Sequence, residues 1–393
     1  MSPTPAPPRL DTDALIDDQR TRIIVCCGSG GVGKTTTAAA LGLRAAERGR
    51  HVVVLTVDPA RRLAQSMGLT YLDNIPRPVD VDSPAGGSLH AMMLDMKRTF
   101  DEIVEAHADP DRAAQILANP FYQSLSSSFA GTQEYMAMEK LGQLQRTDEW
   151  DLIVVDTPPS RSALDFLDAP QRLGRFLDGR LIRLLTAPAS PGRAYMKVLN
   201  AGFSIVTGTL TKVLGAQVLK DMQTFVTAFD TMFGGFRERA ESTYRLLQTP
   251  GTAFLVVAAP EPDALREAAY FVERLAGERM PLAGLILNRV HIPVATQLSA
   301  ARSVAAAEML ENQEPGHGDA AGEPPRYALA AGVLRLHAER MQLAARERRV
   351  AEHFTAAHPT VPVTRVVAQP EDVHDLEGLR SIGSSLASEP EPG

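Results

Sequence analysis

A glycine-rich octamer near the N-terminus constrains the fold of this chain more than any other segment. Residues 28–35, GSGGVGKT, fit the pattern G-x-x-x-x-G-K-[ST], in which backbone N–H groups surround phosphate oxygens. The apolar run RIIVCC precedes the octamer, and a helix-period segment over 34–48 follows it and ends at Gly49. A strand, a glycine loop and a helix in this order are the context that the pattern requires. The octamer therefore predicts a phosphate-binding loop in an α/β protein.

Short runs rich in β-branched residues recur along the chain, and each ends in turn residues. They lie at 22–28, 51–59, 89–95, 150–159, 252–260, 282–290 and 362–370. Several are almost continuously apolar, which is typical of strands buried on both faces of a parallel sheet. Helix-period segments separate them. The alternation predicts a doubly wound, mostly parallel α/β fold with right-handed crossovers, the class of the P-loop NTPases.

One long region breaks this alternation and suggests an inserted unit. Between Asp156 and Thr252 there is no convincing strand, and helical patterns rich in Leu, Val, Phe and Met occupy 171–185, 194–214 and 216–247. A second helix-rich stretch covers 100–144. We therefore expect a helical subdomain formed by about 100–145 and 171–250, within an ATPase domain spanning 21–386. The composition of 311–326 is that of a loop, and we expect disorder in an N-terminal arm, 1–20, and a tail, 387–393.

Composition narrows the class of protein further. The formal net charge is −7, which argues against a broad nucleic-acid surface. The proline-rich N-terminus has no secretory pattern and no segment is apolar enough to span a membrane, so a cytoplasmic protein is expected. Cys26 and Cys27 are the only cysteines. As neighbours on a strand they point to opposite faces, so we expect them to be apolar fillers and not joint ligands of one metal.

The octamer assigns roles to the residues around a triphosphate. Lys34 supplies a positive charge to the phosphates, and the hydroxyl of Thr35 is a candidate ligand of Mg²⁺. Asp156 ends the strand LIVVD, where a carboxylate would hold Mg²⁺ directly or through water; alone, an aspartate there could equally cap a helix. The residues expected to contact the nucleotide in the loop are Gly28, Ser29, Gly30, Gly31, Val32, Gly33, Lys34, Thr35 and Thr36.

Two further strand ends carry candidate polar residues. Asp58 lies at the C-terminal end of the predicted strand at 51–59 and should face the γ-phosphate, because ligands of open α/β sheets bind beyond the carboxyl ends of the strands. It could orient the attacking water or accept its proton, or it could cap the helix that starts near Pro59. Asn288 ends LILN, and its carboxamide could pair with adenine. The following residues lack the pattern that selects guanine, so ATP is favoured over GTP.

These motifs, in this order, resemble the family of anion-pump ATPases and tail-anchored-protein targeting factors (ArsA/Get3), within the deviant-Walker ATPases that include MinD and ParA. The matching stretches include GSGGVGKTTTAAALGLRAAERG, VVVLTVDPARRLAQSMG, WDLIVVDTPPSRSALDFLDAP and LILNRV. The chain is most similar to the bacterial, actinobacterial-type anion-transporting ATPase branch. The resemblance implies a dimer whose nucleotide sites face each other. It also implies that Asp58 and Asp156 are the switch-I and switch-II acids and that Asn288 reads adenine.

The chain departs from the family at three places. Ser29 stands where the family places a signature lysine that reaches the partner's nucleotide. The paired cysteines of the targeting factors and the metalloid cysteines of the arsenite pumps are both missing. Hydrolysis is therefore expected to be slow alone, unless Arg61, Arg62 or a related partner subunit supplies the charge.

Three functions remain open from the sequence. The first is an ATPase whose homodimer or heterodimer acts on a hydrophobic client or a membrane-associated transport partner through the helical subdomain. The second is a nucleotide-binding regulatory subunit with little turnover. The third is a positioning switch like ParA or MinD, although the acidic C-terminus, LASEPEPG, lacks a basic amphipathic helix.

Overall fold

A computed structural model describes residues 7–58, 62–120, 122–123, 133–158, 238–239, 241–293, 295–312 and 327–387. Its centre is an eight-stranded sheet in the order β3-β4-β2-β5-β1-β6-β7-β8. All neighbouring pairs are parallel except β3 with β4. The strands are β1 (Ile23–Cys27), β2 (His51–Thr56), β3 (Arg77–Val79), β4 (Ser88–Met93), β5 (Leu152–Asp156), β6 (Thr252–Ala258), β7 (Leu282–Val290) and β8 (Val363–Val367). The predicted doubly wound α/β fold is confirmed.

All seven predicted runs contain strands, and β3 is the one strand in the described ranges that the sequence analysis missed. Its three residues, Arg-Pro-Val, are too short to give a period, and β3 pairs antiparallel to β4 at the sheet edge. Proline is tolerated there because an edge strand leaves one row of N–H groups unpaired.

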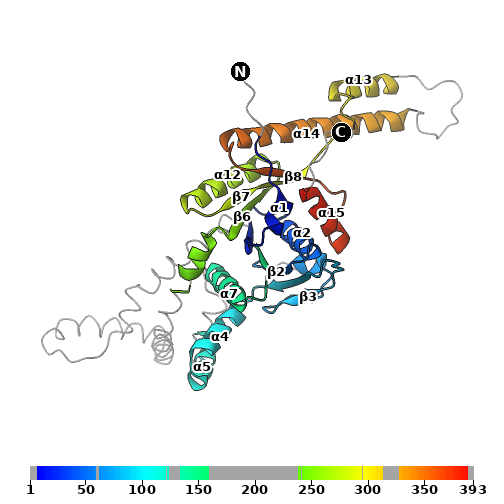
Figure 1. Ribbon diagram of the computed structural model, residues 1–393. Helices are drawn as coiled ribbons and strands as arrows, with labels where there is room; N and C mark the ends of the chain where they lie inside the picture. The colour runs from blue at the N-terminus through cyan, green and yellow to red at the C-terminus, as the bar shows by residue number, and fades with distance from the viewer. Residues whose placement is uncertain are drawn as a thin grey trace, which may run out of the picture.

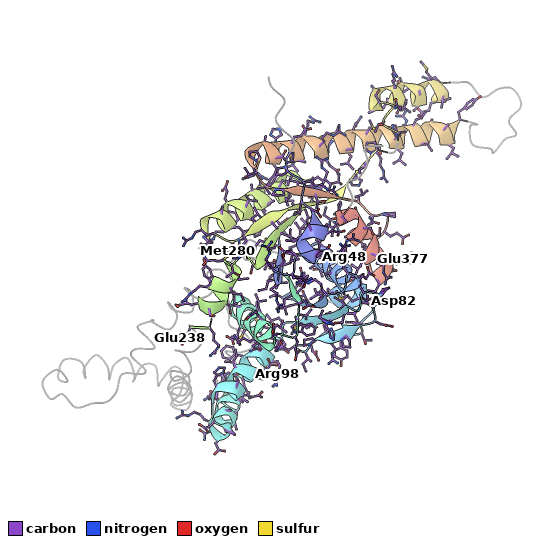
Figure 2. All side chains as sticks on the ribbon, in the orientation of Figure 1. Arg48, Asp82, Arg98, Glu238, Met280 and Glu377 are labelled. Atoms are coloured by element: carbon purple, nitrogen blue, oxygen red, sulfur yellow. The ribbon has the colours of Figure 1, made fainter. Side chains whose placement is uncertain are left out.

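Helices cover both faces of the sheet (Figure 1). One layer contains α1 (Thr12–Asp17), α2 (Lys34–Glu47), α3 (Arg62–Ser66) and α15 (Leu376–Ala387). The other contains α4 (Met96–His107), α5 (Pro110–Leu117), α7 (Gln133–Thr147), α12 (Pro262–Gly277) and α14 (Ala328–Ala357). Arg48 and Glu377 lie on the first side of the sheet, and Arg98 and Met280 lie on the second (Figure 2). The two faces bury separate apolar clusters, so the molecule has three layers.

The expectation of disorder throughout the N-terminal arm is wrong for part of it. Residues 12–17 form α1, where the Asp11 side chain accepts a hydrogen bond from the backbone of Ala14 and caps the helix. Ile16 is fully buried in the α2-side cluster. The guanidinium of buried Arg50 donates to the carbonyls of Ile16 and Thr21, at 2.8 and 2.7 Å. Buried apolar residues and these hydrogen bonds order a segment whose proline-rich composition had suggested a free arm.

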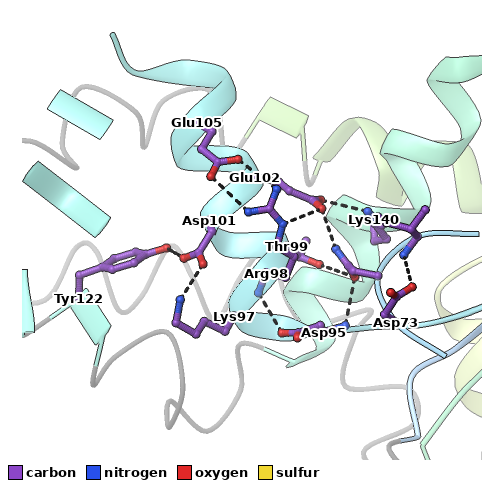
Figure 3. Close-up of polar contacts among 12 residues, drawn as sticks. Asp73, Asp95, Lys97, Arg98, Thr99, Asp101, Glu102, Glu105, Tyr122 and Lys140 are labelled. Carbon is purple, nitrogen blue, oxygen red and sulfur yellow. Dashed lines mark hydrogen bonds and ion pairs between the residues drawn. The ribbon is translucent and has the colours of Figure 1, made fainter. Parts of the chain in front are cut away.

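A polar network attaches α4 to the segment that precedes β3 (Figure 3). The amide of Asn74 donates to Glu102 at 3.2 Å and accepts from the Thr99 hydroxyl at 3.1 Å. Lys140 of α7 reaches the other oxygen of Glu102 at 3.0 Å.

The predicted helical character of 100–144 is seen in α4, α5 and α7, while 159–237 and 313–326 lie outside the described residues.

The 30-residue helix α14 and helix α13 (Ala300–Glu311) pack together as a hairpin that extends away from the sheet (Figure 1). At about 1.5 Å per residue, α14 spans roughly 45 Å. Only its C-terminal half covers the sheet, where Ala351 and Phe354 join the buried cluster. In the part of the chain that the structure describes, no helix is long and apolar enough to cross a bilayer.

Candidate nucleotide site

The glycine loop lies at the carboxyl end of β1, in the middle of the sheet. β1 is paired with β5 on one side and β6 on the other, and all five of its residues are buried. Helix α2 begins at Lys34, directly after the loop, and points its N-terminus at the loop. N–H groups and the positive end of a helix dipole therefore meet at the point where the sequence predicts a phosphate.

The backbone of the loop requires glycine at two places for different reasons. A Cβ atom on Gly28 would lie 2.1 Å from the carbonyl oxygen of Val257 on β6, so no larger residue fits without moving the strand. Gly33 caps α2 with a φ of 92°, which is in the left-handed region. The glycine at position 28 thus serves sheet packing, and Gly33 serves the turn into α2.

Lys34 is almost completely buried, and its ammonium group donates a hydrogen bond to the carbonyl of Ser29 at 2.8 Å. Burial lowers the pKa of Lys34, and the negative charges of Asp156 and Asp58 oppose that shift. The ammonium therefore lies folded back over the loop, within reach of a phosphate bound there.

Asp156 lies at the centre of the site and is fully buried. One carboxylate oxygen, Oδ2, accepts hydrogen bonds from the hydroxyls of Thr35 at 2.7 Å and Thr56 at 2.9 Å. Among the described residues, nothing hydrogen-bonds the other oxygen, Oδ1, although it too is buried. Burial raises the pKa of Asp156 to about 6, against the opposing effect of the two hydroxyls. A buried, partnerless carboxylate oxygen beside a threonine hydroxyl fits a Mg²⁺ site, since Mg²⁺ takes one or two carboxylates and hydroxyls together with phosphate oxygens.

Thr56 is a site residue that the sequence analysis missed. It is the last residue of β2, directly beside Asp156 in the β2–β5 register, and it is buried. Its hydroxyl donates to Asp156 and accepts the backbone N–H of Asp58 at 3.2 Å. The only signal in the sequence was a polar residue closing an otherwise apolar run, HVVVLT.

The structure brings Asp58 to the same edge of the sheet. It follows β2 by two residues, is half-buried, and is tied to Thr56 through its backbone. Residues 59–61, which include Arg61, lie outside the described part, and Arg62 is the exposed first residue of α3.

Asn288 contacts the glycine loop. Its amide nitrogen donates to the carbonyl of Val32 at 2.8 Å, and its oxygen accepts from the backbone of Arg289 at 3.0 Å. A Cβ atom on Gly33 would lie 2.3 Å from the same amide nitrogen. Asn288 therefore supports the loop from β7, a contact that the sequence did not suggest.

Sequence comparison identifies the family of a chain with this site. The profile described as anion-transporting ATPase matches residues 21–313, which is most of the chain. The chain belongs to the anion-transporting ATPase family. The resemblance drawn from the motifs is thereby confirmed.

Curated relatives of this anion-transporting ATPase are ATPases too. The chain is 25% identical over 287 residues to the ATPase GET3 of Malassezia globosa, covering 73% of this chain and 77% of that protein. It is 26% identical over 270 residues to the ATPase ASNA1 homolog of Cryptosporidium parvum, covering 68% and 64%. The ATPase GET3 of Chaetomium globosum is 23% identical over 282 residues, covering 71% and 76%. The protein is therefore an ATPase of the ArsA/Get3 type.

Two expectations about small side chains in this anion-transporting ATPase can be compared with the structure. Cys26 and Cys27 are both fully buried and face opposite apolar clusters, as predicted. The hydroxyl of Ser29 is buried and has no hydrogen-bond partner among the described residues. A serine at this position therefore places a short, neutral group against the loop, where it cannot extend beyond the molecule.

Proposed function

We propose that the protein hydrolyses ATP in a Mg²⁺-dependent reaction at the 28–35 loop. The observation that carries this proposal is the Asp156 carboxylate, with one oxygen held by Thr35 and Thr56 and the other buried without a partner. In this arrangement Thr35 and Asp156 would hold Mg²⁺, which supplies charge neutralisation of the phosphates. The loop N–H groups and Lys34 bind the β- and γ-phosphates.

Asp58 is proposed as the residue that acts on the attacking water. Thr56 lies beside Asp156 in the sheet, and its hydroxyl accepts a hydrogen bond from the backbone N–H of Asp58. This bond favours a position for the Asp58 side chain at the open end of the phosphate loop. There a carboxylate can orient a water molecule and accept its proton. The helix-capping role considered from the sequence is compatible with this one.

Asn288 is proposed to contribute to nucleotide binding in two ways. Its contact with Val32 supports the loop, and its position at the carboxyl end of β7 suits the adenine contact implied by the family resemblance. The preference for ATP over GTP, expected because the residues after Asn288 lack the pattern that selects guanine, belongs to the same proposal.

We further propose that hydrolysis is coupled to a second subunit, either an identical or a related ATPase. Support comes from Ser29, which gives the chain no long cation to send into a neighbouring site. In this proposal, the cycle of ATP hydrolysis drives the handling of a hydrophobic client or a transport partner by the helical subdomain. A regulatory subunit with low turnover is the second candidate, and the same serine favours it.

Calorimetric titration of Mg²⁺ and ATP into the Lys34→Ala variant tests the phosphate site. Binding should weaken severely, because the phosphates lose a cation in a poorly solvated loop. Lys97→Ala is a matched control, since Lys97 lies in a surface ion pair with Asp101. Wild-type affinity in Lys34→Ala would reject the proposal, provided that the control also binds normally.

A further inference from the structure

A small cavity lies on the face of the sheet opposite to α2. Its volume is about 130 Å³, and it opens between the end of β7, strand β8 and helix α14. Its apolar lining comes from Leu287, Val290, Ile292, Ala344 and Ala351. Leu287 and Ala351 belong to the apolar cluster of the α14 side, whereas α2 covers the other cluster. The cavity is thus separate from the phosphate loop.

Two arginines line the same cavity. Arg348 comes from α14 and Arg365 from β8, and both side chains are exposed. Neither guanidinium group makes an ion pair or hydrogen bond with another residue in the described ranges. Guanidinium groups recognise planar carboxylates through paired N–H donors.

Among the described residues that line the cavity, the one acidic residue is already paired. Glu347 is buried, and its two carboxylate oxygens lie 2.9 Å from the backbone nitrogen and 2.7 Å from the Nδ1 atom of His291. Both carboxylate oxygens of Glu347 therefore have hydrogen-bond partners other than Arg348 and Arg365. The cationic surplus of the cavity suits an anion with a single charge.

We propose that this cavity binds a small organic monocarboxylate with a short apolar body. The carboxylate contacts Arg348 and Arg365, and the apolar part fills the space beside Leu287, Val290 and Ala351. The volume limits the ligand to a few heavy atoms, since sites for drug-sized ligands occupy roughly 300–1,000 Å³.

A short segment joins this cavity to the phosphate loop. Asn288 and Arg289 of β7 together oppose a single residue of β8, Val366, which makes a β-bulge. Arg289 has a φ of 61°, in the left-handed region. This bulge lets Asn288 face the loop while His291, three residues on, contacts α14. Occupation of the cavity should therefore alter ATP affinity, a coupling that rests on the proposed nucleotide function.

Binding of isovalerate to the full-length protein without nucleotide tests the site directly. Ligand-detected NMR and calorimetry should show saturable binding with a Kd of about 1 mM or tighter, given the affinity accessible to a ligand of this size. Isovaleramide, which lacks the charge, and acetate, which lacks the apolar body, should each bind at least about tenfold more weakly. Equal binding of isovaleramide, acetate or inorganic phosphate would overturn the proposal, as would no binding of isovalerate.

Matched arginine variants locate the binding. Arg348→Gln and Arg365→Gln should each weaken isovalerate binding by about tenfold, whereas Arg349→Gln, next to Arg348 but outside the cavity lining, should not. All three are exposed positions, and thermal unfolding checks that each variant is folded. Binding that survives both cavity substitutions would overturn the site. If isovalerate binds as expected but leaves ATP affinity unchanged, the site stands and the coupling is rejected; a failure of ATP binding itself would instead reject the proposed function.

Discussion

Thr56 shows how a single buried hydroxyl can organise two acids. It donates to Asp156 and accepts from the backbone of Asp58, so it links the proposed metal ligand to the proposed catalytic residue. Thr56→Val keeps the shape but removes both contacts. We expect hydrolysis to fall by about 10–100-fold, since one charge-assisted hydrogen bond contributes about 1.5–3 kcal/mol. Thr56→Ser should retain most of the turnover.

A merely structural role for Thr56 would give a different result. The pKa of Asp156 should rise further in Thr56→Val, because a hydroxyl that stabilises the carboxylate is lost. In the nucleotide-free protein, a titration of Asp156 followed by NMR should therefore show a higher pKa in Thr56→Val than in wild type, and Thr56→Ser should not show this shift. An unchanged pKa of Asp156 in Thr56→Val would contradict the positioning role.

Asp58 is tested by exchanging its carboxylate for an amide. Asp58→Asn should keep Mg²⁺ and ATP bound while turnover falls by about 10²–10⁴-fold, the contribution of a positioned general base. Calorimetry measures binding and phosphate release measures turnover. Normal turnover would reduce Asp58 to a helix cap.

The raised pKa of Asp156 makes the stability of the nucleotide-free protein depend on pH. The native pKa of Asp156 is about 6, above its ordinary value of 3.8, so between these two pH values the native state holds a proton that the unfolded state has released. The contribution of this group is fully present below about pH 4 and is lost as pH rises through 6. Relative to wild type, Asp156→Asn should therefore gain about 1–3 kcal/mol of unfolding free energy between pH 4 and pH 7. Urea unfolding at both pH values measures this difference, and a constant offset would contradict it.

At the scale of elements, the unit β1–loop–α2 depends on the close approach of two backbones. Gly28 and Gly31 both have positive φ, 149° and 77°, but a Cβ on Gly31 would meet nothing within 4 Å. Gly31→Ala should cost only the left-handed strain, about 1–2 kcal/mol. Gly28→Ala also places its Cβ against Val257 of β6 and should cost at least about 1 kcal/mol more. Urea unfolding compares the two variants, and equal destabilisation would show that the contact with β6 is unimportant.

At the scale of the whole molecule, Ser29 concerns the relation between subunits. A lysine that acts in a neighbouring site resembles an arginine finger, which contributes about 10³–10⁵ in rate in other nucleotide hydrolases. We expect the isolated protein to turn over slowly and Ser29→Lys to raise its rate. The measurement is steady-state phosphate release by the purified protein, with and without a related ATPase subunit. Fast wild-type turnover that is unchanged in Ser29→Lys, Arg61→Ala and Arg62→Ala would show that the missing lysine is irrelevant.

The sequence determined the architecture of this protein because its signals are local. The octamer, its flanking strand and helix, and seven apolar runs each report their own conformation. Their order leaves few topologies for a parallel sheet. The same locality placed Lys34, Thr35, Asp58, Asp156 and Asn288 at carboxyl ends of strands or at the helix start that meets them, so the candidate site could be assembled before any coordinates.

Only the tertiary structure decided which side chains touch one another. The hydroxyl of Thr56 matters because β2 lies beside β5, and Asn288 supports the loop because a bulge in β7 turns it there. The burial of Ile16, which orders α1, likewise depends on a surface built by α2 and distant strands. Strand neighbours, bulges and burial are relations between residues far apart in the chain, and the free energy that fixes them arises only when those segments pack together.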